Sequence, residues 1–305
     1  MKPVTLAAPV TIGAVLMVVY TLLITGADAI TKAFALSYAA PQLFAVSGAI
    51  VAGLSLVASR ISRDQRGLRT YAPRAMAVRS VATVAGAMAF FHAFRLLPFA
   101  EVFVFIALIP IFAGILSGPV LSERVRPQAW GGLALASLAV VILFPSGLSS
   151  IGVGHLVALL AAFLGTVSML AARYICRIEG NLLAQVFDPT AALMMVMVCA
   201  LPFVFQPMSL QDLSWALAYG VILFGARWVL VGAMRVMPAY VVTPLMNLQF
   251  LWMVLFGILL FGETPAASVY LGAGLMVGSS AWLMLDQLRL RPSPTSPPKA
   301  VVPAE

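Results

Sequence analysis

The sequence predicts an all-α integral membrane protein in which ten transmembrane helices form two inverted five-helix repeats. Composition, the spacing of apolar runs and a similarity between the two halves of the chain all support this fold class. Of the 305 residues, 62% are hydrophobic and only 9% are charged, and the mean hydropathy is +1.05. A soluble domain has about 25% charged residues. The composition therefore indicates a chain embedded in a lipid bilayer, and its net charge of +8 does not indicate nucleic-acid binding.

Apolar runs long enough to cross a bilayer, about 20 residues each, follow one another along most of the chain. We expect helices over residues 10–32, 39–59, 77–96, 99–120, 127–145, 153–174, 182–204, 212–234, 239–261 and 265–286. The resulting organisation is a short cytoplasmic N-terminus (1–9), a first repeat (10–145), a second repeat (146–286) and a proline-rich tail (287–305). The tail lacks any apolar periodicity, which is typical of a disordered extension.

Basic residues predict the orientation, because lysine and arginine concentrate in cytoplasmic loops. The predicted loop 60–79 contains six arginines and is placed in the cytoplasm, which puts both termini there as well. Fifteen of the eighteen basic residues then lie on that side, whereas Lys32 and Arg95 lie outside and Arg227 lies within a span.

An internal repeat appears when the chain is shifted by 140 residues. Ala93, Arg95, Pro98 and Val102 then align with Ala233, Arg235, Pro238 and Val242, and the register continues without gaps for some forty residues. Further along, Leu108, Glu123, Gly132 and Leu135 align with Leu248, Glu263, Gly272 and Leu275. Since each repeat contains five helices, the two halves cross the membrane in opposite senses, as in many secondary transporters.

Two segments, RLLPFAEVFVFIALIPIFAGILSGPVLSERV and MPAYVVTPLMNLQFLWMVLFGILLFGETP, resemble the repeated signature of the ten-helix, EamA-type branch of the drug/metabolite transporter superfamily. The resemblance covers residues from about 10 to 286 and implies a carrier of small organic solutes with a central cavity. Asp28 and Lys32 further resemble an Asp-x-x-x-Lys pair of a subgroup that includes riboflavin and S-adenosylmethionine uptake systems and an exporter of opine-type metallophores. That subgroup often has an arginine where this chain has Ser47.

Charged residues within spans are candidates for a site, because their burial is costly unless they are paired or hydrated. We expect Arg227 to meet an anionic group of a solute or to form an ion pair with Glu101 or another acid, and Glu101 to meet a cationic group or a proton. Asp28 and Lys32 are four residues apart on one helical face and either form a salt bridge or take part in gating or substrate recognition. His92 is a candidate for coupling because histidine titrates near neutral pH. Interfacial anchoring and helix capping are the structural alternatives for these residues.

Aromatic and amide side chains complete the predicted binding site, although lipid contact and packing explain such residues equally well. The candidates for stacking and hydrogen bonding are Tyr20, Tyr219, Trp228, Asn247 and Gln249. Asp188 precedes Pro189, a pair that favours the start or restart of a helix.

We therefore expect a non-enzymatic secondary carrier in a bacterial inner membrane, monomeric or homodimeric, for a zwitterionic or aromatic-containing metabolite such as an amino acid. Uptake of a vitamin or nucleoside-like metabolite is the alternative, and a membrane-embedded enzyme or lipid translocator is a further one. Import and export both remain open, as do proton coupling and facilitated exchange. The sequence contains no nucleotide-binding G-x-x-x-x-G-K-[ST] loop and no His/Cys cluster with metal-ligand spacing, so we expect no cofactor and no metal.

Overall fold

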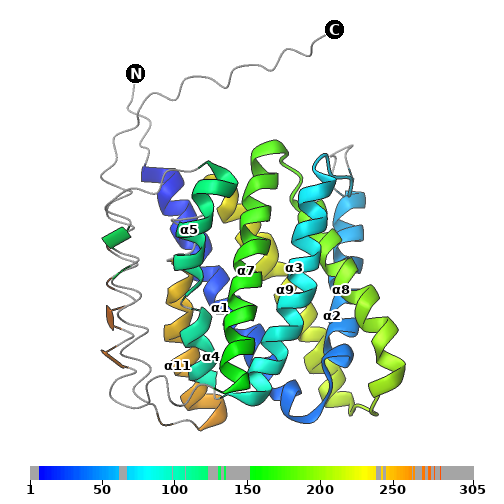
Figure 1. Cartoon of the computed structure of the whole chain (residues 1–305). Coiled ribbons are helices and arrows are strands. Elements are labelled where there is room, and N and C mark those ends of the chain that lie inside the picture. Colours follow the sequence, from blue (N-terminus) through cyan, green and yellow to red (C-terminus); the bar gives the residue numbers. More distant parts are fainter. Residues whose placement is uncertain are drawn as a thin grey trace, which may run out of the picture.

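The structure is a computed structural model that describes residues 7–61, 67–97, 99–106, 108–122, 152–237 and 245–262, with isolated positions elsewhere. Every element in these ranges is a helix (Figure 1). They are α1 (Ala7–Ser37), α2 (Ala40–Ile61), α3 (Pro73–Leu96), α4 (Phe99–Ile106), α5 (Ile109–Leu121), α7 (Val153–Ile178), α8 (Leu182–Val204), α9 (Leu210–Val236), the 3₁₀ turn η2 (Met246–Leu248) and α11 (Gln249–Phe261).

Six of these helices, α1, α2, α3, α7, α8 and α9, are long and apolar enough to cross a membrane. They correspond to the first, second, third, sixth, seventh and eighth predicted spans. The predicted spans 127–145 and 265–286 lie outside the described ranges, apart from isolated positions, so the count of ten remains a prediction.

The predicted helix 99–120 is interrupted. Leu108 donates its amide to the Phe105 carbonyl at 3.0 Å, a tight turn, and α5 starts at the next residue with Pro110 in its first turn. Because proline has no N–H, it cannot donate the hydrogen bond that would continue α4 into α5. The predicted helix 239–261 likewise contains the short 3₁₀ turn η2 directly before α11.

The predictions misplaced three residues. The predicted loop 60–79 was too long: α3 begins at Pro73, so Arg79 lies well inside the helix and not at its boundary. α1 extends to Ser37, beyond its predicted end at residue 32, so Lys32 lies inside the helix and is 8% exposed instead of marking its outer end. Asp188 does not start a helix either: Asn181 caps α8 by accepting the Ala184 N–H, and the helix passes through Pro189.

Helices of the first half pack along helices of the second half. α3 lies along α7, α2 along α8 and α1 along α9, with the helices roughly parallel or antiparallel in one bundle (Figure 1). α2 approaches α9 closely at Gly220, where an added Cβ atom would lie 2.8 Å from the Ile50 Cβ atom and 3.2 Å from the Ser47 Cα atom. Small residues of this kind permit the close backbone contacts found between membrane helices.

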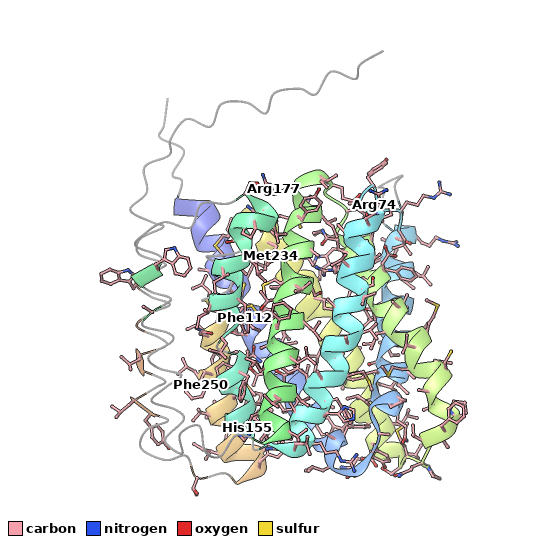
Figure 2. The ribbon with its side chains drawn as sticks, viewed as in Figure 1. Arg74, Phe112, His155, Arg177, Met234 and Phe250 are labelled. Carbon is pink, nitrogen blue, oxygen red and sulfur yellow. The ribbon has the colours of Figure 1, made fainter. Side chains whose placement is uncertain are left out.

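Hydrogen bonds between the halves close both ends of the bundle. At the end marked by Arg74 and Arg177 in Figure 2, the buried Glu179 carboxylate accepts bonds from Thr70 Oγ1 at 2.5 Å and from the Tyr71 N–H at 2.7 Å. Asn181 Nδ2 donates to the carbonyls of residues 67 and 69.

At the opposite end, the Tyr38 hydroxyl donates to Asp212 Oδ2 at 2.7 Å, and Gln42 Nε2 donates to the Gln206 carbonyl at 2.7 Å. The hydrogen bond to Asp212 raises the pKa of the Tyr38 phenol above its usual value, so Tyr38 remains a neutral donor at physiological pH.

The short helices α5 and α11 match each other residue for residue. Each has 13 residues, and their N-caps, Leu108 and Leu248, are 140 positions apart. Each ends on a left-handed residue, Ser122 (φ 54°) and Gly262 (φ 64°), again 140 positions apart. In the LSERV and FGETP segments, the small residue directly before the glutamate is therefore the helix C-cap.

This pair of caps yields a stability prediction. A left-handed conformation costs a residue with a Cβ atom about 1 kcal/mol more than glycine. Ser122→Gly should therefore raise the midpoint of thermal unfolding in detergent, and Gly262→Ser should lower it, as measured by circular dichroism.

Gly53→Ala is the matched control, because Gly53 lies inside α2 with open space around it. Removing this glycine should stabilise the helix slightly. A decrease in the midpoint for Ser122→Gly would contradict the proposed role of the cap.

Candidate functional site

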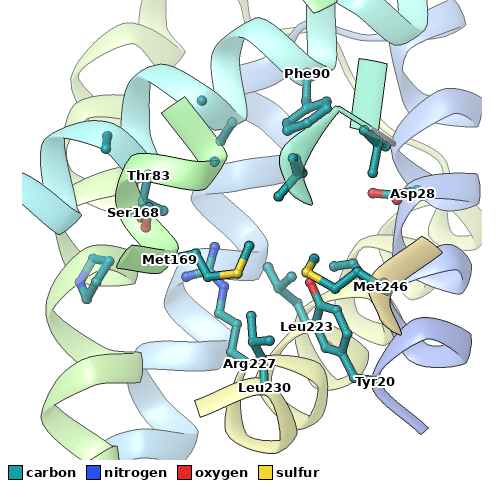
Figure 3. Close-up of a pocket in the computed structure, with 18 of the residues that line it drawn as sticks. Tyr20, Asp28, Thr83, Phe90, Ser168, Met169, Leu223, Arg227, Leu230 and Met246 are labelled. Carbon is teal, nitrogen blue, oxygen red and sulfur yellow. Dashed lines mark hydrogen bonds between the residues drawn. The ribbon is translucent and has the colours of Figure 1, made fainter. Parts of the chain in front are cut away.

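A cavity of about 230 Å³ lies between the two halves of the chain. Its walls come from α1, α3, α4 and α5 of the first half and from α7, α8, α9, η2 and α11 of the second. The polar lining residues are Tyr20, Asp28, Arg79, Thr83, Ser168, Arg227 and Gln249. The remainder is mainly apolar, including Phe90, Met169, Leu223, Leu230 and Met246 (Figure 3).

Asp28 and Arg227 occupy different sides of this cavity, with Met169 and Met246 between them (Figure 3). Asp28 is oriented by Gln249, whose Nε2 atom donates to Asp28 Oδ2 at 2.7 Å. Arg227 donates to the Thr190 hydroxyl. The cavity therefore has a carboxylate on one side and a guanidinium on another, and an apolar surface separates them.

Arg79 is the charged lining residue that the sequence did not reveal, and Thr83 and Ser168 were also missed. Arg79 lies two turns into α3, is 7% exposed, and donates to the carbonyls of Ser168 at 3.4 Å and Gln185 at 3.2 Å. One turn later, Thr83 forms a 2.8 Å hydrogen bond with the Ser168 hydroxyl. The spacing of Arg79, Thr83 and Gly86 on one helical face was the available signal, but Arg79 was assigned to the predicted cytoplasmic loop 60–79.

Four predicted site residues line the cavity together: Tyr20, Asp28, Arg227 and Gln249. Their side chains come from α1, α9 and α11. No hydrogen-bond rule in the sequence predicted that Gln249 would contact Asp28 across the halves. The backbone of Glu101 lies in α4, but its side chain is outside the described part of the structure, so its role remains a prediction.

The other predicted residues lie away from the cavity lining. The Lys32 ammonium lies over the rings of Phe99 and Phe261, 5.3 and 5.0 Å from their centroids, which are typical cation–π distances. The exposed His92 ring has its Nδ1 atom 2.8 Å from the carbonyl of the residue one turn earlier. Asp28 and Lys32 therefore occupy different surroundings, although they share a helical face.

The predicted aromatic and amide residues also separate into different environments. Tyr219 is buried beside Phe44, Trp228 is 36% exposed and packs against Phe224, and Asn247 is 1% exposed. Both amide atoms of Asn247 lack a hydrogen-bond partner among the described residues. Helix faces decide these positions, and the sequence alone did not specify which face meets the cavity.

Residues 11–144 match the EamA-like transporter family. This match covers the first predicted repeat and agrees with the resemblance seen in the sequence. Together with the six apolar helices, it points to a multi-pass membrane protein.

One solved structure, titled "Crystal structure of protein", superimposes with a TM-score of 0.68. The match covers 93% of this chain and 99% of the other chain at 18% sequence identity, a similarity that shows the fold alone. No curated protein sequence matches this chain.

The charges of the cavity yield a reactivity prediction. In a variant with Cys176→Ser and Cys199→Ser, a Thr83→Cys side chain would lie one helical turn from Arg79 in the cavity lining. Two nearby guanidiniums should concentrate anions, so an anionic methanethiosulfonate reagent should react about tenfold faster than a cationic one. Mass spectrometry of quenched samples measures both rates.

Thr166→Cys in the same background is the control. Thr166 lies in α7, is completely buried, and is absent from the cavity lining. It should react slowly with both reagents. Faster modification of Thr83→Cys by the cationic reagent would contradict the predicted positive potential.

Proposed function

We propose that the chain is a secondary transporter that moves a small amino-acid-like metabolite across a bacterial inner membrane by alternating access. The observation that supports this most strongly is a cavity built from both halves, with a carboxylate and guanidiniums separated by apolar side chains. A zwitterionic solute would place its carboxylate at Arg227 and its amino group at Asp28, with its side chain beside Phe90, Met169 and Met246. Asp28 thus takes the role that we first expected for Glu101.

The size of the cavity supports a small solute. Its volume of about 230 Å³ is below the range of about 300 to 1,000 Å³ found for drug-sized ligands. An amino acid or a small derivative suits this volume better than riboflavin or S-adenosylmethionine. Tyr20 and Phe90 supply aromatic surface for a planar side chain.

An inverted repeat supplies the proposed mechanism. The closest helix pairs join the first, second and third helices of one half to the third, second and first helices of the other, as a pseudo-two-fold axis would require. The equal lengths and equivalent caps of α5 and α11 support the same symmetry. Rocking of one half against the other would break the bonds around Glu179 in one state and those of Tyr38 and Gln42 in the other.

The positions of basic residues support the proposed orientation. Arg74 and Arg177 lie at the same end of the bundle in Figure 2. By the positive-inside rule, this end would face the cytoplasm, and both termini would lie on the same side.

Arg227→Ala tests the proposed site. Loss of a charge-assisted contact costs about 1.5–3 kcal/mol, or roughly ten- to a hundredfold in apparent affinity. Proteoliposomes containing the wild-type chain should take up at least one labelled amino acid from a pooled set, and the variant should take up that amino acid at least tenfold more slowly.

Arg235→Ala is the matched control, because Arg235 lies two turns further along α9, is exposed, and is outside the cavity lining. It should retain uptake. Thermal unfolding of both variants checks their folding. Wild-type uptake by Arg227→Ala would exclude this arginine from the site, and absence of uptake by the wild-type chain would contradict the transport proposal for this class of solute.

A further inference from the structure

Arg79 places a second buried positive charge in the proposed transport cavity. It donates hydrogen bonds to two neutral backbone carbonyls, of Ser168 and Gln185, at 3.4 and 3.2 Å. Its Nε atom is buried and has no acceptor among the described residues. The guanidinium is thus held in place by α7 and α8, and no carboxylate of the described residues accepts a hydrogen bond from it.

Arg227 likewise donates to a neutral group of the described residues, the Thr190 hydroxyl. Arg79 and Arg227 line the same cavity, so their like charges repel each other. The mainly apolar lining strengthens this repulsion.

Asp28 is the only carboxylate among the described lining residues. Its hydrogen bond from Gln249 fixes it on a different side of the cavity from Arg227 (Figure 3). Counted over the described lining, the cavity has two positive charges and one negative charge. The described lining therefore has an excess of one positive charge when the cavity is empty, and buried ions without a counter-charge are unfavourable.

We infer that the transported solute supplies this charge: it is an amino-acid-like molecule with a second acidic group and a net charge of −1. This inference rests on the proposed transport function and narrows its substrate class. Arg79 and Arg227 each bind one acidic group, and Asp28 binds the amino group. Planar guanidinium groups match carboxylate and phosphate oxygens in paired hydrogen bonds, so both acidic groups are of this type.

The remaining lining favours an organic solute over a free inorganic anion. Phe90, Met169, Leu223 and Met246 form apolar surface that a small hydrated anion would not cover. Asp28 would repel such an anion, whereas it attracts the amino group of a solute. The Thr83 and Ser168 hydroxyls beside Arg79 add hydrogen-bonding capacity for the second acidic group.

Matched acid and amide probes test the inference with the purified full-length protein. The two pairs are L-glutamate with L-glutamine, and 4-carboxy-L-phenylalanine with 4-carbamoyl-L-phenylalanine. Within each pair the shape is nearly the same, and the net charge at neutral pH is −1 or 0. Ligand-dependent thermal stabilisation gives the affinities, and proteoliposome uptake gives the fluxes. We expect the acid of at least one pair to bind at least tenfold more tightly than its amide.

Arg79→Gln should reduce that ratio to near one, because it should weaken binding of the acid more than binding of the amide. Arg173→Gln is the control: Arg173 also donates to a backbone carbonyl, that of Met234, but does not line the cavity. It should retain the preference for the acid. The readout is the ratio of the affinities for the acid and the amide. A general loss of stability in either variant would lower both affinities and would not change this ratio.

The outcomes separate the inference from the proposed function. Uptake of neutral amino acids with no preference for the acids would overturn the inference and leave transport standing. Binding by no member of either pair would also overturn it, even if another solute were transported. Stabilisation by sodium chloride, but not by sodium gluconate or the acids, would show that an inorganic anion balances the charge of the guanidiniums. That result would overturn the inference as well. Absence of any flux would contradict the transport function itself.

Discussion

The hydrogen bonds from Arg79 to the carbonyls of Ser168 and Gln185 connect the two halves of the bundle where the cavity begins. A guanidinium in apolar surroundings must find acceptors, and these two carbonyls come from α7 and α8. α3 must therefore lie close to both helices. Gly86 permits this approach, because an added Cβ atom there would lie 3.4 Å from the Leu164 Cβ atom and 3.7 Å from the Gly165 amide nitrogen.

Much of the helical architecture was predictable because long apolar runs and a gap-free repeat are strong signals. The offset of 140 residues also relates the caps of α5 and α11, including the left-handed Ser122 and Gly262. What the pattern could not give was the interruption between α4 and α5. That interruption follows from local hydrogen bonding at Leu108 and Pro110, whereas an apolar run is judged by composition over its whole length.

The errors in the candidate site share one physical cause. Hydropathy treats a charged residue as a mark of the membrane boundary, which assigned Arg79 to a loop and Lys32 to the outer end of its span. In the structure both are buried, because Arg79 finds carbonyl acceptors and Lys32 lies over two aromatic rings. Such compensation depends on residues more than 60 positions away in the chain, and no local pattern reveals it. Arg227 was identified because it lies in the middle of a predicted span and so cannot mark the end of one.

The bond between Gln249 and Asp28 gives the proposed carrier a way to connect binding with movement. It joins the two halves inside the cavity, and Asp28 is the described lining residue able to accept the amino group of a solute. A bound ammonium group would compete with the Gln249 amide, because a charged donor forms the stronger hydrogen bond to a carboxylate. Solute binding would thus replace a direct contact between the halves with one that passes through the solute. The same exchange would occur at Arg79 if an acidic group drew its guanidinium away from the carbonyls of α7 and α8. A carrier built in this way would be held together by its own polar contacts when empty and by the solute when occupied. The two halves would therefore be least constrained while the solute replaces the direct contacts between them.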